Sequence, residues 1–164
     1  MKVVKKQTNS KNCIICGMCN PAGVKAPFYE MEDGSVVTLF SYSSEHQSYP
    51  GRVHGGMITC MLDELIGRVI WVTDPTILAV TLDINVKFRK PVPYDTQLIG
   101  IGTVVKNGSR AYTGNACIKD MQGNVLAEGT ATYYKMPAEK ITDADMHEEL
   151  DMFVPDDVTE IALP

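Results

Sequence analysis

Asp63 is the residue whose surroundings best suit it to chemistry. It lies within residues 57–71, where apolar side chains occur on nearly every side of the helix that the sequence predicts, and such a helix must be buried on most sides. Glu64 and Arg68 stand four residues apart in the favourable order and can pair with each other. Asp63 has no such partner, and a carboxylate in apolar surroundings suits a general base or a nucleophile. The alternative is a structural role, in which Asp63 pairs with a distant side chain in the core.

The helical face that carries Asp63 is made of small side chains. At helical spacing, Asp63 shares this face with Gly56, Thr59, Cys60 and Gly67. We therefore expect another group to approach the helix backbone closely on this face.

The tripeptide His54-Gly55-Gly56 precedes the predicted helix. At a helix start the backbone N–H groups lack intrahelical partners, and the positive end of the helix dipole lies there. Such N–H groups form an oxyanion hole when a carbonyl oxygen can reach them. In the alternative interpretation, the glycines only permit a tight turn.

Together these residues resemble a known family. Residues 46–56, HQSYPGRVHGG, are followed by Leu62-Asp63-Glu64, with the acid nine residues after His54. This combination resembles the hotdog-fold acyl-CoA thioesterases of the PaaI and 4-hydroxybenzoyl-CoA thioesterase type. The likeness continues to about Tyr134, and two upstream segments also look like the family: residues 13–17, CIICG, and residues 20–24, NPAGV.

The resemblance implies an acyl-CoA thioesterase, which hydrolyses a thioester to a free acid and coenzyme A. The thioester carbonyl would dock at the helix start, where the Gly55 N–H, aided by Gly56, stabilises the oxyanion. Asp63 would act as a general base towards water, or attack directly and form an anhydride. His54 would shape the turn rather than transfer protons. The carboxylate of Glu64 is the second choice, because Arg68 can neutralise it.

Other residues receive roles from the same resemblance. The family has an Asn or Gln six residues before the histidine, a place taken here by Ser48 with Gln47 beside it. Either side chain can hydrogen-bond a water or simply cap the loop. Thr59 and Gly67 would lie where the acyl chain or a partner subunit approaches.

Basic residues near the predicted strand ends are ordinarily solvated edge charges. The resemblance makes three of them candidates for binding coenzyme A: Arg89, Lys90 and Arg110. In related hotdog enzymes the acid of one subunit faces a groove contributed by another. The resemblance therefore implies a homodimer, or a homotetramer built as a dimer of dimers.

The pattern of strands supports an α+β fold. Residues 78–89 alternate strictly between apolar and mostly polar side chains, and residues 34–42 form an earlier strand. Three further strands are predicted at 96–106, 110–119 and 124–134, joined by hairpin turns and therefore antiparallel in sequence order. With the resemblance, the expectation is a hotdog fold: a long antiparallel β-sheet wrapped around one central apolar helix.

Cys13, Cys16 and Cys19 form a C-x2-C-x2-C run. A closed zinc site needs four ligands, and no second cysteine pair exists, so His46 or His54 would have to fold back. The favoured interpretation is a compact turn of reduced thiols without metal, and a small metal-binding interaction protein is the alternative. With five cysteines in all, an odd number, no disulfide framework is indicated.

Composition limits the partners. The 164 residues carry a net charge of −5, and nine of the 20 acidic residues lie after residue 136 beside a single lysine. The remainder is mildly basic, which suits an anionic ligand such as coenzyme A, but it lacks the extended basic surface of a nucleic-acid-binding protein. No signal peptide or long apolar run is present, so we expect a cytoplasmic protein without a membrane partner. The thioesterase reaction requires no cofactor beyond the coenzyme A of the substrate.

We predict three segments: an N-terminal cysteine-containing segment at 1–33, the hotdog thioesterase domain at 34–136 and an acidic C-terminal tail at 137–164. Within the tail, residues 141–153 have the pattern of a short helix, and partial order is expected.

Two other functions on the same fold stay open. The first is a non-catalytic module that binds acyl-CoA or acyl-carrier protein, because the usual Asn or Gln before the histidine is missing. The second is a hydratase or dehydratase, which is less favoured because such enzymes carry a different histidine motif.

Overall fold

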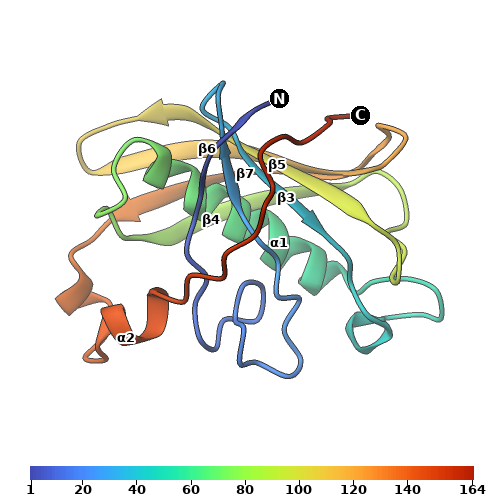
Figure 1. Ribbon diagram of the computed structural model, residues 1–164, viewed down its shortest axis with the longest axis horizontal. Helices are drawn as coiled ribbons and strands as arrows, with labels where there is room; N and C mark the ends of the chain where they lie inside the picture. Colours follow the sequence, from blue (N-terminus) through green and yellow to red (C-terminus); the bar gives the residue numbers. More distant parts are fainter.

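One antiparallel sheet forms most of the protein (Figure 1). The computed structural model describes residues 1–164, apart from the side chain of His147. Seven strands lie in the order β1-β2-β3-β5-β6-β7-β4. Their bounds are β1 Val3–Lys6, β2 Tyr29–Met31, β3 Val36–Phe40, β4 Ala79–Phe88, β5 Leu98–Asn107, β6 Ala111–Asp120 and β7 Val125–Lys135. The predicted antiparallel order of the last three strands is confirmed.

The central helix α1, Gly55–Arg68, lies in the curve of this sheet and continues as the short helix η2, Val69–Val72 (Figure 1). Its buried residues include Met61, Leu62, Leu65 and Ile66. Two glycines of β5 allow the close approach: a Cβ on Gly100 would lie 2.7 Å from Leu65 Cδ1, and one on Gly102 would lie 3.0 Å from the Leu65 carbonyl oxygen. The predicted hotdog arrangement is confirmed.

Strand β4 forms an edge of the sheet, because it pairs only with β7. Its register shifts between Thr81 and Asp83, so Leu82 bulges outward and is 60% exposed. Phe88, at the end of the strand, is 55% exposed. The alternation in residues 78–89 predicts that one face of this strand, with all its apolar side chains, belongs to the core. That prediction is wrong at Leu82 and Phe88, since an edge strand can turn apolar side chains away from its own core. Exposed apolar groups on an unpaired edge are typical of an interface.

The N-terminal segment and the tail pack against each other (Figure 1). Asn9 and Met152 exchange backbone hydrogen bonds, and Lys6 Nζ donates to Asp156 Oδ2 at 2.6 Å. Near the C-terminus, Ile161 is 2% exposed in a second apolar cluster on β2, β3 and β5. The predicted helix at 141–153 is confirmed only over α2, Met146–Leu150, with the 3-10 helices η1, Ser44–His46, and η3, Ala138–Lys140, elsewhere.

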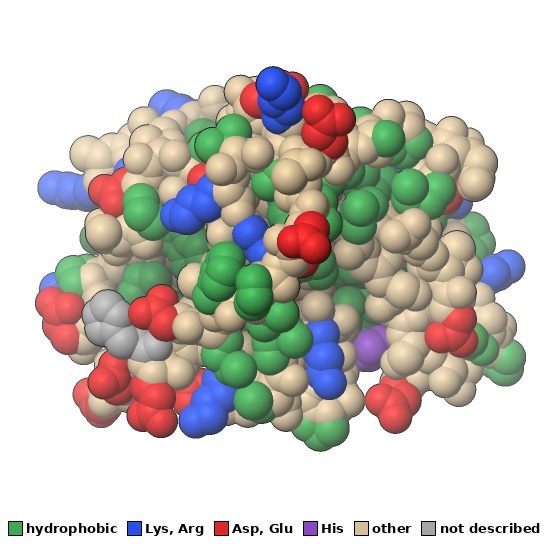
Figure 2. All heavy atoms as spheres, viewed as in Figure 1, with side chains coloured by type: hydrophobic (Ala, Val, Ile, Leu, Met, Phe, Trp, Pro, Cys, Tyr) green, Lys and Arg blue, Asp and Glu red, His purple; other side chains and the backbone are tan. Residues whose placement is uncertain are grey.

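Acidic side chains gather around α2 at the lower left of Figure 2. This is where the acidic residues of the tail lie in the fold, including Glu148 and Glu149 of α2. Within the described part of the chain, no helix has both the length and the apolar character that crossing a bilayer requires.

Candidate active site

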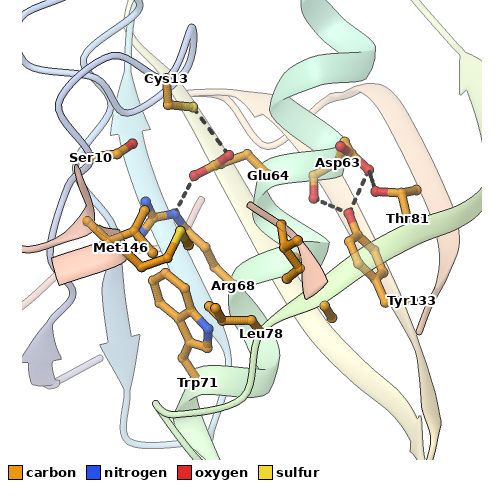
Figure 3. Close-up of a pocket in the computed structure, with 14 residues that line it drawn as sticks. Ser10, Cys13, Asp63, Glu64, Arg68, Trp71, Leu78, Thr81, Tyr133 and Met146 are labelled. Atoms are coloured by element: carbon orange, nitrogen blue, oxygen red, sulfur yellow. Dashed lines mark hydrogen bonds and ion pairs between the residues drawn. The ribbon is translucent and has the colours of Figure 1, made fainter. Parts of the chain in front are cut away.

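A cavity of about 290 Å³ opens beside α1 and contains Asp63 (Figure 3). The helix contributes Asp63 and Gly67, and the strands β4 and β7 contribute Thr81 and Tyr133. Trp71 and Leu78 supply apolar surface, and the tail supplies Ile141, Met146 and Leu150. The cavity therefore combines two carboxylates, those of Asp63 and Glu64, with apolar lining, as small-molecule sites commonly do.

Two hydroxyl groups hold the Asp63 carboxylate by a single oxygen (Figure 3). Thr81 Oγ1 donates to Asp63 Oδ1 at 3.0 Å, and the Tyr133 hydroxyl lies 2.6 Å from the same oxygen. Tyr133 also lies 2.6 Å from the Asp63 carbonyl oxygen. Among the described residues, Asp63 makes no ion pair and its Oδ2 accepts no hydrogen bond. The carboxylate is thus oriented, but one oxygen stays available to a substrate or a water.

Tyr133 stays protonated and so remains a donor. Burial, followed by the hydrogen bond to Asp63 and its negative charge, raises the pKa of Tyr133 well above its ordinary value. Its ring stacks on Tyr112, with ring centres 5.1 Å apart and planes 9° apart. Tyr112 in turn donates to the carbonyl oxygens of Ile66 and Gly67. The two rings fix the cavity side of α1 against β6 and β7.

The predicted pairing of Glu64 with Arg68 is confirmed. Arg68 Nε donates to Glu64 Oε1 at 2.7 Å, and the guanidinium lies between the rings of Phe28 and Trp71. Burial alone would lower the pKa of Arg68, but the neighbouring Glu64 charge raises it above the ordinary value. Asp63 therefore differs from Glu64 as the sequence suggested, because only Glu64 is neutralised by a cation.

The two glycine N–H groups at the start of α1 differ in their hydrogen bonding. His54 is the N-cap residue, and its Nδ1 accepts the Gly56 N–H at 2.9 Å, which gives His54 a backbone role. The Gly55 N–H has no partner among the described residues. Since a Cβ on Gly55 would lie 3.4 Å from Phe88 Cζ, the end of β4 lies directly over the helix start. Of the two glycine N–H groups, only that of Gly56 is used by His54.

The remaining predicted residues of the helix and its loop are spread out. Gly67 lines the cavity, whereas Thr59 Oγ1 donates to the Gly55 carbonyl oxygen at 2.9 Å and lies nearer the helix start. Gln47 and Ser48 are exposed on the loop before the helix. That loop is closed by a bridge between Gln47 and Val53 and by hydrogen bonds between Ser48 and Arg52 and between His54 and His46. Neither Gln47 nor Ser48 lines the cavity that contains Asp63.

The three basic candidates lie at opposite ends of β4. Arg89 pairs with Glu128, and Lys90 Nζ donates to Asn124 Oδ1 at 2.8 Å, both just beyond the end of β4 where Gly55 lies. Arg110 lies near the other end, since its carbonyl accepts from Lys135, which pairs with Ala79. Ten residues of strand span roughly 30 Å, so one coenzyme A headgroup within one chain cannot contact both ends closely.

Asp63 and Gly55 are also too far apart within one chain to act on the same carbonyl. A helix rises about 1.5 Å per residue, which places them about 12 Å apart along α1. Reacting groups have to approach to roughly 3–3.5 Å. A site that uses both residues therefore requires a second copy of the chain.

Thr81, Tyr133 and the tail residues Met146 and Leu150 were not predicted from the sequence. The signal for Tyr133 is the buried row Ala127, Gly129, Ala131 and Tyr133 on β7, where small residues end at a large polar one. The sequence of the tail carries no comparable signal for Met146 and Leu150. Their contacts with the cavity depend on how the tail folds back against the rest of the chain.

Comparisons with known proteins agree with this fold. The sequence profile of the thioesterase superfamily matches residues 50–127, and the predicted resemblance is confirmed. The chain is 28% identical to the Mus musculus acyl-coenzyme A thioesterase THEM4 over 70% of its own length, and it spans about half, 49%, of that relative. It is 23% identical to the Homo sapiens acyl-coenzyme A thioesterase 13, covering 60% of this chain and 71% of that one.

Solved structures show the same fold. A hypothetical thioesterase from Streptococcus pneumoniae TIGR4, crystallised with coenzyme A, superposes with a TM-score of 0.62 at 23% identity, over 68% of this chain and 86% of that one.

Proposed function

We propose that this chain, whose residues 50–127 match the thioesterase superfamily, is an acyl-CoA thioesterase that hydrolyses a thioester to a free acid and coenzyme A. The observation that carries the proposal is the Asp63 carboxylate, which lies in an apolar cavity with one oxygen oriented and the other available. The named relatives act on acyl-coenzyme A according to their names, which supports the same substrate class.

The active site is built from two subunits. Thr81 contacts Asp63 near the start of β4, and Phe88 lies over Gly55 near its end. If the free edge of β4 pairs antiparallel with a second copy, the start of each strand meets the end of the other. Asp63 then faces the partner subunit's Gly55, which removes the separation of about 12 Å within one chain. The exposed Leu82 and Phe88 supply apolar surface for this interface.

In this arrangement the Gly55 N–H receives the carbonyl oxygen of the thioester as negative charge develops on it. Removing one oxyanion donor typically lowers kcat on the order of 10²–10³-fold. Asp63 Oδ2 either takes a proton from water, whose oxygen attacks the carbonyl, or attacks it directly. In the first case the carbon–sulfur bond breaks, and the proton that Asp63 took from water passes to the departing thiolate. In the second case the thiolate leaves and takes a proton from solvent, and water then hydrolyses the anhydride on Asp63 to the free acid. Thr81 and Tyr133 keep Oδ1 in place throughout.

Coenzyme A would extend along the subunit boundary. The antiparallel arrangement brings Arg110 of one chain towards Arg89 and Lys90 of the other, so basic side chains from both copies surround the mouth of the site. No cofactor beyond coenzyme A is required for hydrolysis. A cytoplasmic location fits the five unpaired cysteines, since thiols stay reduced there.

The test is release of free thiol from a panel of acyl-CoAs by the wild type and by Asp63→Asn. The substitution keeps the side-chain volume and removes the base, so we expect turnover to fall by at least about 100-fold while the protein stays folded. Asp157→Asn, at an exposed position of the tail, is the matched control and should retain wild-type turnover. Undiminished release by Asp63→Asn would place the chemistry elsewhere.

A non-catalytic module that binds acyl-CoA is the second candidate, and one observation favours it. Gln47 and Ser48, the residues expected to position water, are exposed and outside the cavity. The same panel separates the two functions: a module would bind acyl-CoA without releasing thiol, and Asp63→Ala would leave that binding unchanged.

A further inference from the structure

Three potential metal ligands meet beside α1, to the left of the Asp63 contacts in Figure 3. They are the thiols of Cys13 and Cys16 and the carboxylate of Glu64, and their donor atoms all lie within 4.8 Å of one another. Cys13 Sγ is 3.6 Å from Glu64 Oε2. Donor atoms around a tetrahedral zinc ion stand roughly 3.5–3.8 Å apart, so small side-chain shifts would complete such a geometry.

The backbone around Cys13 is already shaped to stabilise a thiolate. Cys13 Sγ accepts the Ile15 N–H at 3.3 Å, and the Gly17 N–H donates to the Cys13 carbonyl at 2.9 Å. A Cβ on Gly17 would lie 2.3 Å from that carbonyl oxygen, so only glycine fits the turn. Deprotonated sulfur is the form that binds zinc.

Glu64 has one oxygen fixed and one directed at the thiols. Arg68 holds Oε1, whereas Oε2 faces Cys13 (Figure 3). A ligating carboxylate is commonly anchored in this way by a neighbouring donor. Once both thiols release their protons, the two thiolates, the Glu64 carboxylate, the Arg68 guanidinium and one divalent cation together carry no net charge. The cation would thus replace two protons without leaving a net charge in the cluster.

We propose that Cys13, Cys16 and Glu64 bind one zinc-type divalent cation, which joins the N-terminal segment to α1. Thiolate ligands favour zinc over magnesium or calcium. Ser10, Cys13 and Glu64 line the cavity, so the fourth position is open to water. This differs from the metal-free turn favoured by the sequence, because the third ligand comes from the helix. Cys19 is exposed and lies outside the cluster.

The two histidines considered from the sequence are engaged elsewhere. His46 Nε2 lies 2.8 Å from the Ala22 carbonyl oxygen, and His54 caps α1 through Gly56. Neither belongs to the Cys13, Cys16 and Glu64 cluster, so the proposal does not require the chain to refold around a histidine.

The test uses the full chain, reduced and freed of metal by a chelator. Titration with Co²⁺ should produce the thiolate-to-cobalt charge-transfer absorption with one equivalent per chain, and Zn²⁺ should remove it. Zn²⁺ should also protect two of the five thiols from alkylation. Because the site is independent of Asp63, Asp63→Asn should bind the metal like the wild type, whether or not the proposed hydrolysis is found.

Variants identify the ligands. Cys13→Ser and Cys16→Ser should abolish the charge-transfer band, and Glu64→Gln should weaken Zn²⁺ binding on the order of 100-fold. Cys19→Ser is the matched control from the same cysteine run and should bind like the wild type. Thermal unfolding of each metal-free variant separates lost ligands from a lost fold. The proposal is overturned if fully reduced wild type gives no band, or if the band survives Cys16→Ser and disappears in Cys19→Ser.

Discussion

At the scale of single residues, the reactivity proposed for Asp63 depends on the phenol that orients it. The Tyr133 hydroxyl is 2.6 Å from Oδ1, and a hydrogen bond to a charged group contributes about 1.5–3 kcal/mol. Tyr133→Phe keeps the ring and its stacking but lets the carboxylate rotate. We expect kcat for thioester hydrolysis to fall by about tenfold or more, since 1.36 kcal/mol corresponds to a tenfold change in rate.

Tyr112→Phe is the matched control for this measurement. Tyr112 is an equally buried tyrosine that bonds to α1, but its acceptors are the backbone carbonyls of Ile66 and Gly67. Loss of the Tyr112 hydroxyl should lower the free energy of unfolding by about 1 kcal/mol and leave kcat nearly unchanged. Equal kcat in wild type and Tyr133→Phe would show that Asp63 needs no such orientation.

The thiol of Cys13 gives a second prediction, about pH. Its pKa is lowered to about 7, so in metal-free protein its rate of alkylation should rise through pH 7 and level off above it. Burial raises the pKa of Cys117, whose alkylation should therefore continue to rise at more alkaline pH. Mass spectrometry of both peptides after brief iodoacetamide treatment measures the two profiles. Identical profiles would contradict the prediction.

Spacing along one helix was enough to predict the Glu64–Arg68 pair and to single out Asp63. The partners of Asp63 could not be predicted in this way. Thr81 and Tyr133 reach it only because β4 and β7 pair in one register over α1, and that register is set by long-range packing. The role of Glu64 as a proposed metal ligand could not be predicted for the same reason, because Cys13 and Glu64 are 51 positions apart in the sequence.

At the scale of elements, the tail determines the size of the proposed acyl pocket. Met146 and Leu150 of α2 line the Asp63 cavity together with Trp71 and Leu78. Leu150→Ala removes apolar volume from this wall without touching Asp63. We expect the ratio of kcat/KM for longer over shorter acyl-CoAs to rise by about tenfold, since each methylene in an apolar pocket contributes roughly 1–3 kcal/mol.

Phe153→Ala is the control for this element, because Phe153 belongs to the same tail but is 58% exposed and lies outside the cavity. Its chain-length preference should match that of the wild type. A preference unchanged in both variants would mean that the acyl group does not reach α2.

Elements with strong local patterns were predictable, whereas those defined by their neighbours were not. The alternation in residues 78–89 and the hairpin turns after β5 and β6 indicated four of the strands. Strands β1 and β2 are short and acquire their pairing from distant segments, so their sequences carry no clear signal. The position of β4 at the edge of the sheet could not be predicted either, because the alternation of apolar and polar side chains does not show which strands lie beside β4.

At the scale of the whole molecule, the proposed site can be divided between two chains and reassembled. Asp63→Asn removes the carboxylate, and Gly55→Pro removes the N–H. Proline is well tolerated at the first helical position, and His54 already has the extended backbone, φ −64° and ψ 135°, that a residue before proline prefers. Gly55→Ala, which keeps the N–H, is the matched control and should remain active.

Each variant alone should be inactive, but mixed dimers should recover activity. Random mixing in equal amounts makes half of the dimers mixed, and each mixed dimer has one intact site, so about a quarter of wild-type turnover should return. Mixing wild type with the double variant Gly55→Pro, Asp63→Asn provides the complementary measurement. A site shared between subunits retains about a quarter of the activity, whereas a site within one chain retains about half. Two results together would require that the carboxylate and the N–H act from different chains. The mixture of the two single variants must recover activity, and the mixture of wild type with the double variant must retain about a quarter of wild-type turnover.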